Sequence, residues 1–106
     1  MLVFRVGVAD SWLALGEPDK AEAVLLPYEG DFSGLPPAHP YKGLIQQVAG
    51  HIRMKQGRRA EALEKLRAAD AIFTPMGPGG AQFLEMSQRI RSGQTPGRVQ
   101  SSASSR

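Results

Sequence analysis

The chain has 106 residues, of which 42% are hydrophobic and 22% charged, and its formal net charge is +3 at pH 7. It contains no cysteine, which excludes disulfides, thiolate metal ligands and a cysteine nucleophile. No apolar run reaches the roughly 18 residues of a membrane span, and the N-terminus is not a convincing secretory signal. We therefore expect a cytoplasmic chain with one folded domain over residues 1–92.

The charges are distributed unevenly along the chain. Residues 1–35 carry six acidic and two basic side chains, whereas residues 36–106 carry eleven basic and four acidic ones. Such a division can steer an acidic partner to one end of the molecule, or favour head-to-tail contact between copies. The simpler interpretation is that both charged regions are solvated faces.

The first predicted helix covers residues 2–15 and ends at Gly16, a residue type that commonly follows a helix C-terminus. Its apolar residues recur at the helical spacing, at Phe4, Val8, Trp12 and Leu15. Residues 2–8 also alternate as a strand would, but the continuation beyond them favours a helix. A second apolar row leaves hydrophobic residues on two faces, so we expect a second copy or another partner to cover one of them.

The same periodicity predicts four further helices, over residues 18–28, 41–56, 58–73 and 81–92. Pro18 suits a first helical turn, where its missing N–H has no hydrogen-bond partner to lose. Proline and glycine in residues 29–40 and 74–80 predict loops. Residues 93–106 offer almost nothing to bury, so they predict a disordered tail.

One sequence pattern occurs twice. Residues 12–25 (WLALGEPDKAEAVL) and 53–66 (RMKQGRRAEALEKL) each contain a glycine, an alanine five residues later and a leucine four residues beyond the alanine. Gly16 and Gly57 lie 41 residues apart, an interval typical of stacked helical repeats. Small residues at Ala9 and Gly50 would allow the two helices of each pair to approach closely.

The two copies resemble a tetratricopeptide repeat over about residues 2–75, with a third half-repeat over residues 81–93. The first copy matches that family through Ala9, Trp12, Leu15, Gly16, Ala21, Leu25 and Tyr28. It departs from the family at Arg5, Gln46 and Arg53, where large apolar or aromatic residues are typical, and residues 36–42 form an insertion. The resemblance implies an all-α stack of two antiparallel helix hairpins with a C-terminal capping helix, part of a right-handed α-solenoid.

The resemblance also implies a function in protein–protein interaction, with a peptide or partner helix held in a groove along the first helix of each hairpin. Carried over position by position, the ligand-facing residues are Val3, Val6, Asp10, Leu13, Ala14, Leu44, Gln47, His51, Met54 and Lys55. Asp10 would repel a C-terminal carboxylate, so we do not expect the groove to clamp a chain terminus.

A second hypothesis comes from basic residues near the turn between the third and fourth predicted helices. Arg53, Arg58 and Arg59, together with Lys55, form a candidate basic patch that could contact the phosphates of a nucleic acid. No aromatic residues are interleaved with them, which disfavours the stacking mode of single-strand binding. Protein binding is therefore the preferred interpretation.

The sequence offers no constellation of residues typical of an enzyme or a metal site. His39 and His51 are the two histidines; His51 has no carboxylate three or four residues away, and no metal-ligand pair is visible. We expect surface or turn positions for the serines, Ser87 included. Residues 77–80 lack the lysine and hydroxyl residue of a phosphate-binding loop, so we interpret them as a turn. We expect no cofactor, metal or catalytic activity.

Overall fold

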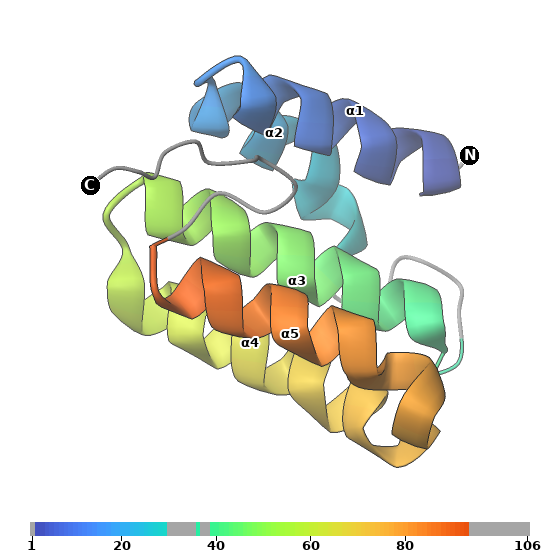
Figure 1. The fold of residues 1–106 in the computed structure, drawn as a ribbon. Helices are drawn as coiled ribbons and strands as arrows, with labels where there is room; N and C mark the ends of the chain where they lie inside the picture. The colour runs from blue at the N-terminus through green and yellow to red at the C-terminus, as the bar shows by residue number, and fades with distance from the viewer. Residues whose placement is uncertain (1, 30–35, 37–38, 94–106) are drawn as a thin grey trace.

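A computed structural model describes residues 2–29, 36 and 39–93, with side chains from residue 6 onward. Within these ranges the chain is helical and contains no β-strand, which confirms the all-α prediction (Figure 1). The elements are α1 (Leu2–Ala14), α2 (Pro18–Leu25), η1 (Leu26–Tyr28), α3 (Pro40–Lys55), α4 (Arg59–Phe73), η3 (Thr74–Gly80) and α5 (Ala81–Arg91). Most of the predicted loop over residues 29–40 lies outside the described residues, as does the predicted tail beyond Gly93.

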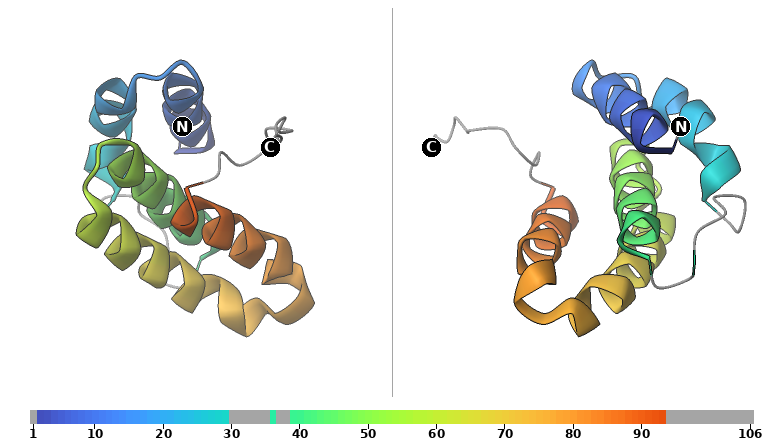
Figure 2. Two further views of the ribbon diagram at one scale, coloured as in Figure 1. Left: turned by 60° about the vertical axis from the view of Figure 1, so that its left-hand side comes forward. Right: turned by 90° about the vertical axis from the view of Figure 1, so that its right-hand side faces the viewer.

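Helix α3 lies at the centre of the molecule and contacts α1, α2, α4 and α5. The α1–α2 pair and the α3–α4 pair each run antiparallel, and α5 packs beside α3 and α4 (Figure 1). Figure 2 shows α1 and α5 on different sides of α3. Nine residues of α3 are buried, and four of them are polar or charged: Lys42, Gln47, His51 and Arg53.

The turns after α1 and α3 have the same geometry. Gly16 and Gly57 adopt φ values of 79° and 78°, in the left-handed region that favours glycine. The N–H of the following residue donates to the carbonyl five residues earlier, at 2.9 Å after Gly16 and 2.8 Å after Gly57. These bonds satisfy carbonyls that a helix end leaves without partners. Gly16 and Gly57 therefore end their helices in the same way, as the sequence predicted.

Several element boundaries differ from the predicted ones for local reasons. The helix expected over residues 18–28 is an α-helix only to Leu25 and continues as the 3₁₀ turn η1, because Pro27 cannot donate a backbone hydrogen bond. Helix α3 begins one residue early, at Pro40, where His39 Nδ1 accepts a hydrogen bond from the Tyr41 N–H at 3.1 Å. Residues 74–80 form 3₁₀ turns around Gly77, whose φ is 62°.

The core is built from small and aliphatic residues on the facing sides of the helices. Fully buried residues on the α1–α2–α3 side and on α4 include Ala9, Ala21, Leu25, Ile45, Ala49, Ile52, Ala62, Leu66, Ala69 and Phe73. Burying each large aliphatic or aromatic side chain contributes roughly 1.5–3 kcal/mol. At the far end Phe73 stacks on Phe83, with ring centroids 4.8 Å apart, and this contact connects α4 to α5.

Glycine substitutions on α3 and α1 should change stability in opposite directions. A Cβ on Gly50 would lie 2.8 Å from Leu66 Cγ and 3.1 Å from the Ala62 carbonyl oxygen, whereas a Cβ on Gly7 would meet nothing within 4 Å. We expect Gly50→Ala to lower the free energy of unfolding by about 1–3 kcal/mol through overpacking. Gly7→Ala should raise it by about 0.5–1 kcal/mol through helix propensity. Urea unfolding followed by circular dichroism measures both, and equal shifts would contradict the close approach of α3 and α4.

Candidate ligand-binding cleft

Helices α1, α3 and α5 enclose a pocket of about 290 Å³ that opens to the surface. A second pocket of about 220 Å³ adjoins it, shares His51 and Ile90 with it, and extends to Met54, Lys55 and Gly93. We call the two pockets together the cleft. The larger pocket is lined by Val6, Gly7, Asp10, Leu44, Gln47, Val48, His51, Met86 and Ile90.

Two features keep the cleft open. Gly7 lies within α1 and lines the larger pocket, and the space where its side chain would stand is empty. On the other side, Gln47 Nε2 donates to the Phe83 carbonyl oxygen at 2.7 Å and to Ser87 Oγ at 2.8 Å. These bonds hold α5 against α3, and Ser87 is fully buried rather than at the surface as expected. The wall of the cleft that α5 forms is therefore held to α3 by hydrogen bonds within the protein.

The structure brings together most of the residues predicted to face a ligand. Val6, Asp10, Leu44, Gln47 and His51 line the larger pocket, and Met54 and Lys55 line the smaller one.

Three of the predicted ligand-facing residues do not line the cleft. Leu13 is only 7% exposed and belongs to the core between α1, α2 and α3. Ala14 is exposed but lines neither pocket, and the side chain of Val3 lies outside the described part of the chain.

Four lining residues were not among those carried over from the repeat pattern: Gly7, Val48, Met86 and Ile90. Met86 and Ile90 lie four residues apart, on one side of α5. Their position opposite α1 depends on how α5 folds back after η3, which no local pattern encodes.

His51 is the most unusual polar group in the cleft. Its side chain is 8% exposed, and its Nε2 atom is buried without a hydrogen-bond partner in the described structure. Burial, followed by the nearby positive charge of Lys55, lowers the pKa of His51 to about 4. The ring is therefore neutral at pH 7. Asp10 is an exposed residue on the facing helix α1, and partial desolvation of its carboxyl raises its pKa.

The expected basic patch is not a free cationic surface. Arg53 is buried, and its guanidinium forms two hydrogen bonds of 2.8 Å with Glu29. Arg58 pairs with Glu22 at 3.0 Å and with Glu61 at 2.6 Å. Hydrogen bonds from Gln56 and then Arg58 lower the pKa of Glu22, and the hydrogen bond from Arg58 lowers the pKa of Glu61. These pairs bind η1 and α2 to the α3–α4 turn.

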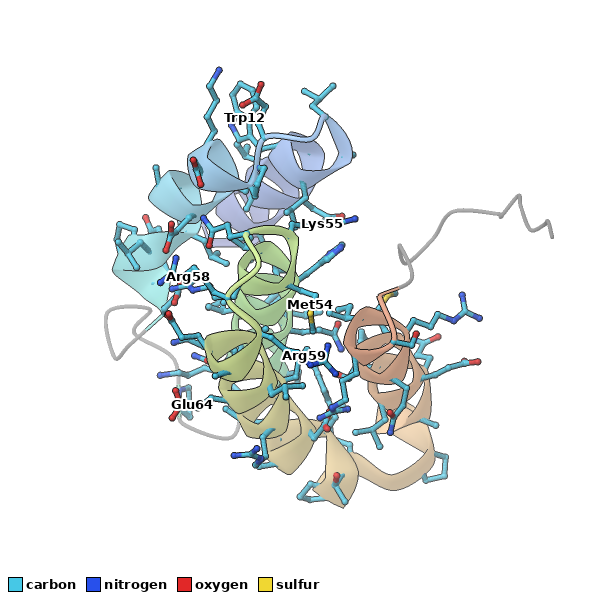
Figure 3. All side chains as sticks on the ribbon, turned by 90° about the vertical axis from the view of Figure 1, so that its left-hand side faces the viewer. Trp12, Met54, Lys55, Arg58, Arg59 and Glu64 are labelled. Carbon is cyan, nitrogen blue, oxygen red and sulfur yellow. The ribbon has the colours of Figure 1, made fainter. Side chains whose placement is uncertain are left out.

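Figure 3 shows the two sides of the turn between α3 and α4. Arg58 lies on the side of α2, whereas Met54 lies on the side of α5. Arg59 is exposed, and its Nη1 lies 3.7 Å from the Met54 sulfur. Of the three arginines predicted to form the patch, Arg59 alone remains exposed and outside an acidic pair among the described residues.

The described part of the chain contains no group of three or more histidine, aspartate or glutamate side chains placed to hold a metal ion. None of its described helices combines the length and hydrophobicity needed to span a membrane.

No protein-family model, curated protein or solved structure matches the chain.

Removing one partner of the buried ion pair should be strongly destabilising. Arg53→Met removes the bidentate donor of the buried Glu29 carboxylate and leaves Lys65 Nζ, 3.2 Å away, as its cationic partner, so we expect a loss of about 3 kcal/mol in unfolding free energy. Arg53→Met combined with Glu29→Met should recover most of this loss, because no unpaired charge remains buried. Urea unfolding of both variants tests the pair, and additive losses would contradict it.

The buried histidine should make stability depend on pH. The folded-state pKa of about 4 lies below the ordinary value of 6.5, so the unfolded chain binds the proton first as pH falls. We expect His51 to lower the unfolding free energy by about 2 kcal/mol between pH 7 and pH 5, with the effect levelling off below pH 4. The raised pKa of Asp10 acts in the opposite direction.

The variant His51→Phe serves as the control in unfolding measurements across this pH range. It should lose most of the wild-type slope, because it removes the titrating ring. An unchanged slope would show that another group is responsible.

Proposed function

We propose that the chain is a tetratricopeptide-like helical module that binds a peptide or a partner helix in the cleft. The observation that carries this proposal is the origin of the lining residues. All nine residues around the larger pocket come from α1, α3 and α5, and none comes from α2 or α4. In a stack of helix hairpins, these are the first helices of successive repeats.

The helix ends support the repeat interpretation. Gly93 follows α5 with a φ of 88°, close to the values at Gly16 and Gly57, and its N–H donates to the Ile90 carbonyl oxygen at 3.1 Å. The equivalent bonds after α1 and α3 run from Gly16 to Leu13 at 3.0 Å and from Gly57 to Met54 at 3.1 Å. The three helices that border the cleft thus end alike.

The chemistry of the cleft supports binding of a protein segment. Five of its lining residues are apolar side chains, and the few polar groups lie among them rather than in a separate cluster. A concave, mostly apolar surface with a few placed polar groups suits side chains projecting from a peptide or a helix. The acidic partners of Arg53 and Arg58 count against the nucleic-acid hypothesis, because those guanidinium charges are already compensated.

A bulky side chain at position 7 should fill the cleft and weaken peptide binding without unfolding the protein. Gly7→Phe places a ring in the empty space beside α1, and Gly7→Ala changes helix propensity while leaving that space open. Peptides selected by the wild-type chain from a displayed library of random linear sequences are then measured against both variants. We expect Gly7→Phe to weaken them by more than about tenfold and Gly7→Ala to bind them like the wild type.

Circular dichroism melting confirms that each variant is folded. A library that yields no binders, or binders that Gly7→Phe leaves unaffected, would refute the proposed function. An exposed residue far from the cleft provides a further control: Ala68→Phe on α4 adds the same ring and should change nothing.

A further inference from the structure

Charged side chains connect the first helix pair, α1 and α2, to the rest of the fold. Glu29, which follows η1, accepts two hydrogen bonds of 2.8 Å from Arg53 on α3, and Lys65 Nζ on α4 lies 3.2 Å from the same carboxylate. Glu22 on α2 lies 3.5 Å from Arg53 and 3.0 Å from Arg58. We call these five residues the ionic cluster. Its acids come from α2 and the end of η1, and its cations come from α3, α4 and the turn between them.

The buried pair at the centre of the ionic cluster contributes more to geometry than to stability. The side chains of Arg53 and Glu29 are each 5% exposed. Because both charges are removed from water, such a pair stabilises a fold little more than apolar residues of the same size would. Arg53 Nε is in addition buried without a hydrogen-bond partner in the described structure. The fork of a guanidinium, however, matches a carboxylate in one orientation, so the pair fixes where η1 lies along α3.

The apolar contacts beside the ionic cluster lack this directionality. The first helix pair and α3 share one buried apolar core, formed by Ala9, Leu13, Ala21, Leu25, Ile45, Ala49 and Ile52. Three of these residues are alanines, whose single methyl group gives the surface a shallow relief. Burial of apolar surface is favourable in any direction, and apolar cores lose a unique arrangement before they lose stability. The core therefore defines the position of the first helix pair less sharply than the bidentate contact does.

The position of α2 affects the cleft through α1, because these two helices run antiparallel in close contact (Figure 1). Helix α1 contributes Val6, Gly7 and Asp10 to the lining of the larger pocket. The opposite wall, α5, is held to α3 by the hydrogen bonds from Gln47. Arg58 lies on the side of α2 (Figure 3), and no member of the ionic cluster lines the cleft. Two separate polar contacts to α3 thus place the two walls.

We propose that the ionic cluster sets the register of the first helix pair on α3 and thereby the width of the cleft. Arg53 and Glu29 are positioning residues, which act on the cleft through α2 and α1. A buried polar contact that specifies one register at the expense of stability is an established device in helical assemblies. The cluster has this role before any ligand binds, so it is separate from the binding of a peptide.

Two labels placed across the cleft measure its width. The chain contains no cysteine, so Ser11→Cys on α1 and Gln82→Cys on α5 provide the two thiols for nitroxide labels. Both positions are exposed. Pulsed electron spin resonance then gives the distribution of distances between the labels. In the labelled chain without further changes, which we call the parent, we expect one narrow distribution.

Arg53→Met combined with Glu29→Met removes the bidentate contact without leaving the carboxylate buried. We expect this double variant to keep most of the parent's resistance to urea and to broaden or split the distance distribution, by about twofold in width. Arg53→Lys keeps the charge and loses the fork, so it should broaden the distribution as well. The matched control is Glu85→Met with Arg89→Met, which removes an exposed ion pair of 3.6 Å within α5 and should change neither quantity.

The distances decide between a positioning role and a purely structural one. A folded double variant that keeps the parent's narrow distribution would overturn the proposal, because the apolar core alone would then set the register. Should the double variant not fold, Arg53→Lys decides: a broadened distribution supports the proposal, and an unchanged one with lower stability overturns it. The measurement needs no ligand, so its result does not depend on whether the cleft binds a peptide.

Discussion

Close packing against α3 is the constraint on which the rest of the structure depends. Gly43 and Gly50 present backbone where other residues present side chains, and the space beside them is occupied by the Phe73 ring and by Leu66. Helix α4 can therefore lie directly on α3. The bonds from Gln47 then position α5, and the Arg53–Glu29 pair positions η1, so three neighbouring elements take their places from one helix.

The cleft is a consequence of this arrangement. Helices α1 and α5 both rest on α3 but do not fill the space between them, because Gly7 has no side chain and Gln47 is drawn toward Phe83 and Ser87. The larger pocket is apolar except where Asp10, Gln47 and His51 border it. A neutral histidine and a carboxylate with a raised pKa are features that folding alone does not favour, which is why they direct attention to a ligand.

Features that depend on residues close in the sequence could be predicted, whereas contacts between residues far apart in the sequence could not. Helix periodicity and the doubled glycines predict the helices closely, because hydrogen bonds between neighbouring turns decide them. The positions carried over from the tetratricopeptide pattern place His51 and Asp10 at the cleft. They misplace Leu13, because α2 and α3 together cover that side of α1. Arg53 is buried because Glu29, 24 residues away, approaches it, and Ser87 is buried because Gln47, 40 residues away, bonds to it. Neither contact can be predicted from the residues that are neighbours in the sequence.

The single tryptophan occupies a position with a practical consequence. Trp12 is half-buried against the α1–α2–α3 core, and the Lys20 ammonium lies 4.8 Å from the centre of its ring. Its fluorescence therefore reports on the first helix pair, whereas the far-ultraviolet dichroism reports on all the helices together. The first helix pair contacts the rest of the fold chiefly through α3, so it can melt before the other helices do. Comparing the two spectroscopic transitions would reveal whether the module unravels from its amino-terminal end or cooperatively as one body.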